Sequence, residues 1–399
     1  MSERTPERRE LMKQMAVLGT ASAAGIATIG ATRNAFAQTD VREFGGDFSI
    51  LIAASDAPQG VKNIANVVCT GANDQIEINQ AIAKLLPSRN SGLGGVVHLS
   101  QGNFDITDQI LMRTRTSLIG SGRATILKAR SSWNSRNNPG LIGGVIEPDG
   151  NDIDKCHVAS LAIDGNNREV HGIFFNITQP NFDDGSPDAA NSFTDLYIWR
   201  TGGDGIHLTG TRMRATQLSR IRVWNPGGYG YFLNNPDSFY SHLETGSSGK
   251  SGFFIGRPNN RLTNCKAWFS AGHGFQIDSQ RNQLSACESQ DNVKHGYDIR
   301  AGQVSLTSCH ADSNSWNRDN PQSNYSGFFI HQFYGYVQLI SCQAYDKNEN
   351  NRGEWQKYGF ELEGSNSYCQ IIGSGRGNAS GKLSNPSPGV DSKVEVIGA

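Results

Sequence analysis

The sequence predicts an all-β solenoid, a parallel β-helix in which short strands of successive coils stack on one another. The prediction rests on a recurring glycine phrase, on a second phrase that recurs before it, and on strand-like alternation inside both. A period in the twenties is typical of stacked structural units, and apolar residues at every second position are typical of a strand. The glycine phrase reads glycine, apolar, any residue, apolar, and it opens at Gly172, Gly205, Gly230, Gly252, Gly274, Gly296, Gly327 and Gly359.

A cysteine phrase precedes the later glycines, and its copies share one register. An apolar residue stands three positions before each cysteine, as in Leu262 and Cys265. One coil cannot bury its own apolar face, so neighbouring coils must stack to close a core. We therefore expect a column of buried free thiols, formed by Cys265, Cys287, Cys309 and Cys342. Close-spaced cysteine or histidine pairs are absent from the sequence, so no metal cluster is expected.

Residues 1–37 read as an export signal. They contain the paired Arg8 and Arg9, a dilute apolar run from Met15 to about Ala31, and the small-x-small site at Ala35–Ala37. This pattern resembles a twin-arginine signal peptide. We expect the mature chain to begin near Gln38, to be periplasmic or secreted, and to have no membrane association after the signal is removed.

Three further segments follow the signal. Residues 38–95 hold lead-in strands and a short helix with helical apolar spacing, which starts at Asn73 or Asp74 and reaches Leu85. Residues 96–376 hold the β-helix coils, and residues 377–399 form a Ser/Pro/Gly-rich tail.

The start of the coils resembles a known family. The phrases that carry the resemblance are Gly94–Leu99, Gly102–Ile106 and Leu118–Gly122, which follow the short helix. They are similar to the opening of the pectate-lyase-like superfamily of single-stranded right-handed parallel β-helices. The resemblance implies a right-handed coil with an N-terminal helix that caps the open end of the core. It does not specify a reaction, because polysaccharide lyases, hydrolases, epimerases and phage tailspikes share this opening.

The partner implied by this resemblance is a polysaccharide or oligosaccharide that lies extended in a groove along the helix. The net charge of −1 gives no electrostatic reason to expect nucleic acid. No cofactor is expected, and Ca²⁺ stays an open alternative without a sequence indication. Trimers are common in the superfamily, so a homo-oligomer is also an open alternative.

Side chains alternate between the two faces of a strand. The residues one and three positions after each glycine should point inward. The residues one position before it, two after it and four after it should therefore share one outer face. His273 and His295 occupy the same position on adjacent coils, about 5 Å apart by strand spacing. Imidazoles close to carboxylates suit proton transfer near neutral pH. The candidate catalytic residues are His273, His295, Asp298, Arg300, Asp278, Asp204 and His207.

We expect an enzyme, a polysaccharide lyase or a uronate C5 epimerase, in which His273 or His295 removes the C5 proton and Arg300 neutralises the carboxylate. The first alternative is hydrolysis by paired carboxylates, with Asp204 acting beside Asp278 or Asp298. Asp204–Gly205 is similar to part of the polygalacturonase pattern, although the paired aspartates of that branch are missing.

The second alternative is a non-catalytic glycan-binding or surface structural protein. A tryptophan column and basic residues on a second face would contact sugars there, and an outward phenylalanine column would form a stacking floor. The candidate substrate-binding residues are Trp199, Trp224, Trp268, Arg222, Lys266, Tyr229 and His331.

Overall fold

The computed structural model describes residues 49–86, 93–133, 142–179, 189–316, 324–331, 335–346, 355–364, 368–384 and 393–397. The predicted export signal lies outside these residues, so it stays a prediction, as do the domain bounds. No helix within the described ranges is long and apolar enough to span a membrane.

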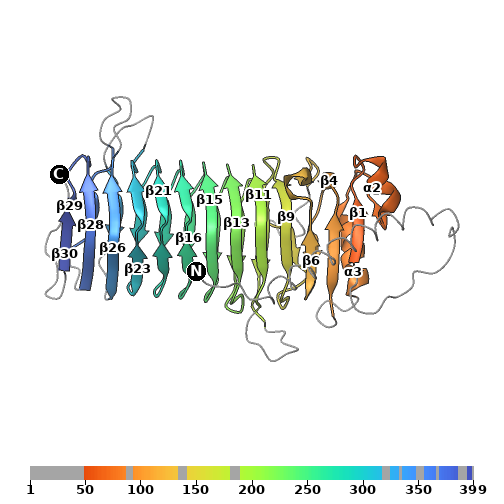
Figure 1. The fold of residues 1–399 in the computed structure, drawn as a ribbon, viewed down its shortest axis with the longest axis horizontal. Helices are drawn as coiled ribbons and strands as arrows, with labels where there is room; N and C mark the ends of the chain where they lie inside the picture. The colour runs from red at the N-terminus through yellow and green to blue at the C-terminus, as the bar shows by residue number, and fades with distance from the viewer. Residues whose placement is uncertain are drawn as a thin grey trace, which may run out of the picture. The chain divides into compact units, whose positions relative to one another are not determined.

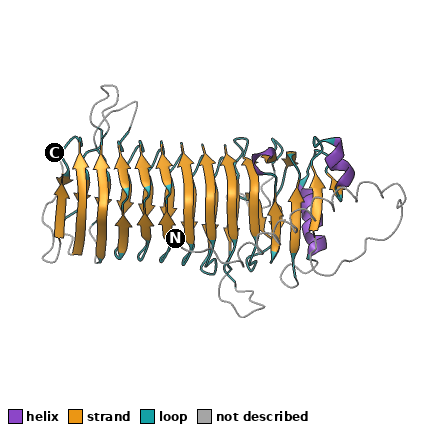
Figure 2. Ribbon diagram, in the orientation of Figure 1, coloured by secondary structure: helices purple, strands orange, loops and turns teal. Residues whose placement is uncertain are grey.

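Parallel strands pair coil by coil into two sheets (Figure 1). Strands far outnumber helices among the described residues (Figure 2). The first sheet, which we call the glycine sheet, consists of strands that mostly follow the recurring glycines. Its members are β5 (Ile110–Met112), β8 (Gly144–Pro148), β10 (His171–Asn176), β12 (Ile206–Thr209), β14 (Tyr231–Asn234), β16 (Phe253–Ile255), β19 (Phe275–Ile277), β22 (Tyr297–Ile299), β25 (Phe328–Ile330), β27 (Phe360–Leu362) and β29 (Leu383–Ser384). Each strand pairs in parallel with the strand of the next coil, which confirms the predicted parallel β-helix.

The second sheet, which we call the cysteine sheet, carries the strands around the cysteine phrase. Its members are β1 (Ser49–Ala53), β2 (Val67–Val68), β3 (Gly95–Leu99), β4 (Gly102–Ile106), β6 (Thr116–Ile119), β7 (Thr125–Ala129), β9 (His157–Asp164), β11 (Ser192–Trp199), β13 (Gln217–Trp224), β15 (Phe239–Gly246), β17 (Arg261–Thr263), β18 (Lys266–Trp268), β20 (Gln283–Ser285), β21 (Glu288–Gln290), β23 (Val304–Thr307), β24 (His310–Asp312), β26 (Tyr336–Tyr345), β28 (Tyr368–Arg376) and β30 (Lys393–Ile397).

Residues in the left-handed backbone region form the corners of the coils. A left-handed residue bends a strand sharply and is uncommon for any residue except glycine. One column lies inside the cysteine sheet at Asp195, Arg220, His242, Asn264, Ala286, Ser308 and Ser341, with φ between 51° and 55°. A second column of left-handed residues follows the last strand of each coil in the cysteine sheet. It consists of Arg200, Asn225, Ser247, Phe269, Asp291 and Ser313. A third precedes the sheet at Ala190, Ala215, Asp237, Asn259, Arg281 and Gln303.

The core between the sheets is filled by matching side chains of successive coils. Aromatic rings of the glycine sheet stack with neighbouring centroids 4.6 to 5.0 Å apart, and the stack runs through Tyr231, Phe253, Phe275, Tyr297, Phe328 and Phe360. The four cysteines of the repeat are buried and free, as predicted.

Helix α3 (Gln75–Leu85) covers the N-terminal end of this core, as predicted. It buries Ile78, Ile82 and Leu85. Asp74 precedes the helix but makes no side-chain cap bond to it. Instead, its carboxylate accepts the backbone N–H groups of Gly71 and Asp105, which ties the helix start to strand β4. A second helix, α2 (Gln59–Ile64), and a 3₁₀ turn, η2 (Gly122–Ala124), complete the secondary structure of the described residues.

The recurring glycines serve close packing between the sheets. A Cβ atom at Gly252 would lie 2.6 Å from Cβ of Ala267 and 2.8 Å from the carbonyl oxygen of Gly274.

We predict that Gly252→Ala lowers the free energy of unfolding by about 1–3 kcal/mol, the usual cost of overpacking. Gly60→Ala is the control, because a Cβ at Gly60 in α2 meets nothing within 4 Å. Urea denaturation measures both variants, and equal effects would contradict the packing role.

Candidate functional site

The outer face of the glycine sheet carries the polar columns that the sequence predicts. Strand pairing brings His207, Phe232, Phe254 and Gln276 side by side on successive coils. Asp298 continues the same column on β22. Four strand spacings separate His207 from Asp298, which is about 19 Å. The predicted catalytic residues therefore form two separate clusters.

The first cluster contains His171, Asp204, His207 and Tyr229. The Asp204 carboxylate uses both of its oxygens: Oδ1 accepts the backbone N–H of Tyr229 at 2.7 Å, and Oδ2 lies 2.7 Å from Nδ1 of His207. Asp204 is buried and His207 is partly exposed, with 20% of its side chain accessible. An ionised carboxylate only accepts hydrogen bonds, so His207 donates from Nδ1, and in the neutral ring the lone pair is on Nε2. This is the arrangement of a carboxylate-oriented base.

His171 has the opposite arrangement. Its Nδ1 accepts the backbone N–H of Asp204 at 2.8 Å, so the ring proton must be on Nε2. Burial lowers the pKa of His171 to about 4, although Asp204 opposes this shift. The ring centroids of His171 and His207 are 4.8 Å apart. One imidazole thus offers an N–H group and its neighbour offers a lone pair on the same face.

Lys250 completes the first cluster, and the sequence analysis did not select it. Its ammonium lies 5.1 Å from the ring centroid of Tyr229, and its side chain is exposed. Burial raises the pKa of Tyr229, so this phenol keeps its proton. The sequence signal was available: lysine recurs two residues before the glycine at Lys250, Lys294 and Lys357.

The ligand atoms of His171, Asp204 and His207 lie within 4.8 Å of one another, which satisfies the distance condition for a metal site. These atoms nevertheless already accept hydrogen bonds: His171 Nδ1 accepts one from the backbone, and each Asp204 oxygen accepts one. As described, the three residues form a hydrogen-bonded acid–base group rather than a preformed metal site.

The outward phenylalanines do not form a floor for sugar rings. Phe232 stacks on Phe254 with centroids 4.6 Å apart and an angle of 8°, and His207 stacks on Phe232 at 4.3 Å. Because these faces cover one another along the sheet, the rings present their edges to the outside. The stack supports His207 from one side.

The second cluster surrounds Asp298, whose side chain is only 1% exposed. Arg300 donates to Oδ2 of Asp298 from Nε at 2.8 Å and from Nη2 at 2.6 Å. His331 Nε2 lies 2.8 Å from Oδ1 of Asp298, and its Nδ1 lies 2.9 Å from Glu363. Burial opposes ionisation of Asp298, but the hydrogen bond from His331 and the charges around it hold its pKa at about 2. Asp278 lies 3.7 Å from Nε of Arg300.

His273 and His295 belong to this second cluster, and neither presents a free lone pair to the outside. His295 Nδ1 accepts the backbone N–H of Ser326 at 2.9 Å, so its proton is on Nε2. His273 places Nε2 3.3 Å from Oδ2 of Asp298, while its Nδ1 is buried without a hydrogen-bond partner. Burial lowers the pKa of His273 to about 4 and that of His295 to about 3. Arg300 is likewise engaged by Asp298.

The predicted tryptophan column lies on the cysteine sheet, apart from both clusters. Trp199 pairs with Trp224, and Gly246 separates Trp224 from Trp268. Because Gly246 has no side chain, the two indoles meet over it with centroids 5.3 Å apart. The basic side chains beside them are paired with carboxylates, Arg222 with Glu244 and Lys266 with Glu288.

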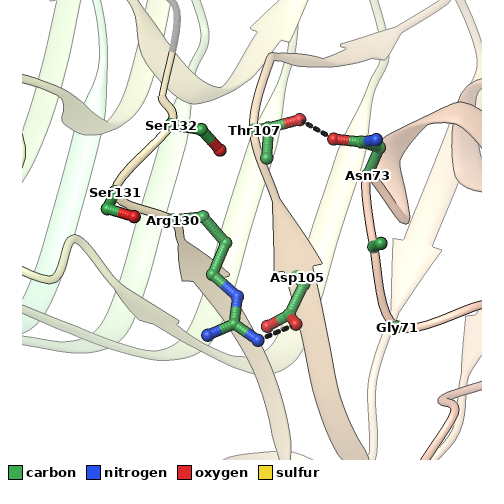
Figure 3. Close-up of a pocket in the computed structure, with 8 residues that line it drawn as sticks. Gly71, Asn73, Asp105, Thr107, Arg130, Ser131 and Ser132 are labelled. Carbon is green, nitrogen blue, oxygen red and sulfur yellow. Dashed lines mark hydrogen bonds and ion pairs between the residues drawn. The ribbon is translucent and has the colours of Figure 1, made fainter.

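A pocket of about 330 Å³ lies near the N-terminal cap (Figure 3), and none of its lining residues belongs to the predicted sites. Arg130 is paired with Asp105, and Thr107 donates to Asn73 at 2.5 Å. Four of its polar side chains are thus paired with one another, and we place no chemistry there.

Comparisons with known proteins agree with this architecture. The family model of the right-handed β-helix region matches residues 188–375. The A-module of Azotobacter vinelandii mannuronan C-5 epimerase AlgE6 superposes with a TM-score of 0.63 and 16% identity, over 83% of this chain and 97% of the module. The A-module of AlgE4 from the same organism gives 0.62 and 16%, over 82% and 98%.

The enzymatically active domain of tailspike protein 2 from bacteriophage CBA120 gives a TM-score of 0.57 and 12% identity, over 76% of this chain and 45% of that one. A search of curated protein sequences finds no match. The chain thus has the right-handed parallel β-helix fold.

The burial of Asp298 predicts a structural role for the second cluster. Asp298→Asn should lower the free energy of unfolding by about 1.5–3 kcal/mol, because it removes the charged acceptor of the hydrogen bonds from Arg300 and His331. Asp195→Asn is the matched control: it removes an exposed partner of Arg220 and should change stability little, because solvent screens the pair. Denaturant unfolding of both variants tests this, and a cost for D298N no larger than for D195N would contradict it.

His331 should make stability depend on pH. The hydrogen bond to Asp298 raises the pKa of His331 above its ordinary value. Its contribution is therefore complete below the unfolded pKa of about 6.5 and is lost as the pH rises through the higher folded pKa. His331→Gln should cost about 1.5–3 kcal/mol in mild acid and progressively less in alkali. Unfolding free energies of both proteins measured across pH check this, and a cost that grows with pH would refute it.

Proposed function

We propose that this protein is a carbohydrate-active enzyme that removes the C5 proton of a uronate residue in a polysaccharide, leading to C5 epimerisation or β-elimination. The observation that carries the proposal is the His207–Asp204 pair. Asp204 holds Nδ1 of His207 at 2.7 Å, which orients the lone pair of Nε2 outward on a partly exposed face. His207 thereby takes the role that the sequence analysis gave to His273 or His295.

The reaction needs a base and a means of stabilising negative charge. Nε2 of His207 takes the proton as the C5–H bond breaks, and the electron pair moves into the adjacent carboxylate. Positive charge and hydrogen-bond donors must meet that carboxylate, and Lys250 provides an ammonium group beside Tyr229. Return of a proton from water to the opposite side of C5 gives the epimer. Departure of the C4 oxygen, which takes up a proton from water, gives the unsaturated product instead.

The comparisons support a glycan as the partner, since the similar solved structures include two mannuronan C-5 epimerases. Identity of 16% shows a shared fold, so the choice of reaction depends on the first cluster. We also propose that the protein is exported, following the signal-like segment at residues 1–37.

Hydrolysis by Asp204 with Asp298 has less support. Their strands are four coils apart, about 19 Å by strand spacing, whereas paired carboxylates of glycosidases lie about 5–9.5 Å apart. The cations around Asp298 also keep it ionised, so it cannot act as the acid.

Non-catalytic glycan binding is the second candidate, and the indoles of Trp224 and Trp268 favour it. They lie partly exposed on the cysteine sheet, where Trp199, Arg222 and Lys266 extend the face. In this reading the aromatic surface binds the glycan and the first cluster performs no chemistry. The substrate-binding roles of Tyr229 and His331 remain predictions, although His331 has both nitrogens engaged.

Exchange of the C5 proton with solvent tests the proposal, because it precedes both outcomes. We expect the purified protein in D₂O to introduce deuterium at C5 of polymannuronate or polygalacturonate, read by NMR, with ultraviolet absorbance reporting any unsaturated product. His207→Gln should reduce exchange by about 10²–10⁴-fold, the usual contribution of a general base. Lys250→Gln should also slow it.

His98→Gln on β3 is the control and should exchange at the original rate. Equal rates for H207Q and H98Q would overturn the assignment of the base. Absence of exchange by the unaltered protein, together with retained glycan binding that Trp224→Ala abolishes, would favour the non-catalytic reading.

A further inference from the structure

We infer that the fold fixes His171 as a permanently neutral N–H donor and that Nε2–H of His171 contacts the substrate carboxylate during proton removal. The inference rests on the proposed function and adds a catalytic residue to it. Its starting point is the hydrogen bond from the backbone N–H of Asp204 to Nδ1 of His171, at 2.8 Å.

The same bond recurs along the sheet, so it belongs to the fold. The residue before one glycine accepts the backbone N–H of the residue before the next: Asp204 accepts from Tyr229, Ser251 from His273, His295 from Ser326, and Ser326 from Tyr358. A backbone N–H is an obligatory donor whose loss in a buried place is costly. The buried backbone N–H of Asp204 therefore requires an acceptor, and Nδ1 of His171 supplies it.

This requirement fixes the protonation of His171. A proton on Nδ1 would place two hydrogens between nitrogens 2.8 Å apart and would break the bond, so the ring is neutral with its proton on Nε2. The surroundings agree: 7% of His171 is exposed, and Phe174 stacks on its ring at 5.7 Å. The charged and titratable neighbours are Asp204, His207 and Lys250, of which Asp204 favours and the other two oppose protonation.

The recurring hydrogen bond from a backbone N–H, which we call the ladder bond, engages Nδ1 of His171. It leaves Nε2 of the same ring without a structural role. Elsewhere Asp204 and Ser326 accept the corresponding backbone N–H with a side-chain oxygen close to the backbone. The imidazole of His171 is longer, so its second nitrogen lies further from the backbone than the accepting atom. No described residue accepts a hydrogen bond from Nε2 of His171, and the ring adjoins His207, the proposed base.

A carboxylate whose C5 lies over His207 gains negative charge as the proton leaves. A neutral N–H group can stabilise that charge without giving up its proton to the base next to it. The inference therefore assigns Lys250 and His171 to one carboxylate, as an ionic and a neutral donor.

Two isosteric variants separate the two nitrogens. His171→Asn places an amide oxygen near the position of Nδ1, which keeps the ladder bond but removes the outer donor. His171→Gln places an amide N–H near the position of Nε2, which keeps the donor but removes the ladder acceptor. Ser326→Ala removes a ladder acceptor away from the first cluster and is the control for stability.

We expect H171N to keep its melting temperature and to lose about 10²–10³-fold in the turnover number for C5 exchange, with little change in KM, as for loss of an oxyanion donor. H171Q should melt lower, as S326A does, but keep more activity than H171N. S326A should keep full activity.

The tautomer has a readout that needs no activity. ¹⁵N NMR of the histidine rings should show His171 neutral with its proton on Nε2 from about pH 5 to about pH 8, and added polymannuronate should shift that Nε2–H signal. A proton on Nδ1, or titration within this range, would overturn the inference even if the enzyme is active. H171N with an unchanged turnover number would overturn it as well. If the unaltered protein neither exchanges nor binds any polyuronate, the proposed function fails and the ligand assignment fails with it, while the tautomer is still decided by the spectrum.

Discussion

Every coil of this protein is held in register with the next by parallel backbone hydrogen bonds, and this register determines what each side chain can contact. A residue at one position of the repeat lies one strand spacing, about 4.8 Å, from the same position on the next coil. Inside, this spacing stacks the rings of Phe253 and Phe275 at 4.6 Å. Outside, it brings Phe174 and His207 to 5.1 Å and His273 and His295 to 5.4 Å.

The same register gives similar residues different chemistry. His171 and His295 each accept a backbone N–H from the following coil, so the fold uses their lone pairs. His207 lies two residues after its glycine rather than one before it. There Asp204 orients it, and no described residue donates a backbone N–H to it. Asp298 has the same place in the repeat as His207, but it is buried under Arg300 and His331. One column therefore holds the proposed base in the first cluster and a buried, ion-paired carboxylate in the second.

The sequence was sufficient for the architecture because glycine and apolar periodicity follow directly from stacking. It predicted the parallel coils, the capping helix, the inward cysteines and the outward columns. It could not locate the left-handed corners, since Phe269, Ala286 and Arg281 have no preference for that conformation and adopt it because the coil must turn there.

The sequence was also insufficient to choose among the histidines. Which nitrogen of His171 or His295 is free depends on a backbone N–H that belongs to the next coil. The identity of the residues does not reveal that hydrogen bond. The distance between Asp204 and Asp298 likewise became clear only from the register. Lys250 could have been selected, because its position two before the glycine recurs, but its approach to Tyr229 is a tertiary contact.

A crystal structure of His207→Gln bound to a polyuronate oligomer is the most direct test of the central claim, that the first cluster is the site of chemistry. The account predicts one sugar carboxylate between Lys250 and Nε2 of His171, with C5 of that sugar over residue 207. An oligomer seated over Arg300 and His331, or over Trp224 and Trp268 on the cysteine sheet, with the first cluster empty, would contradict it.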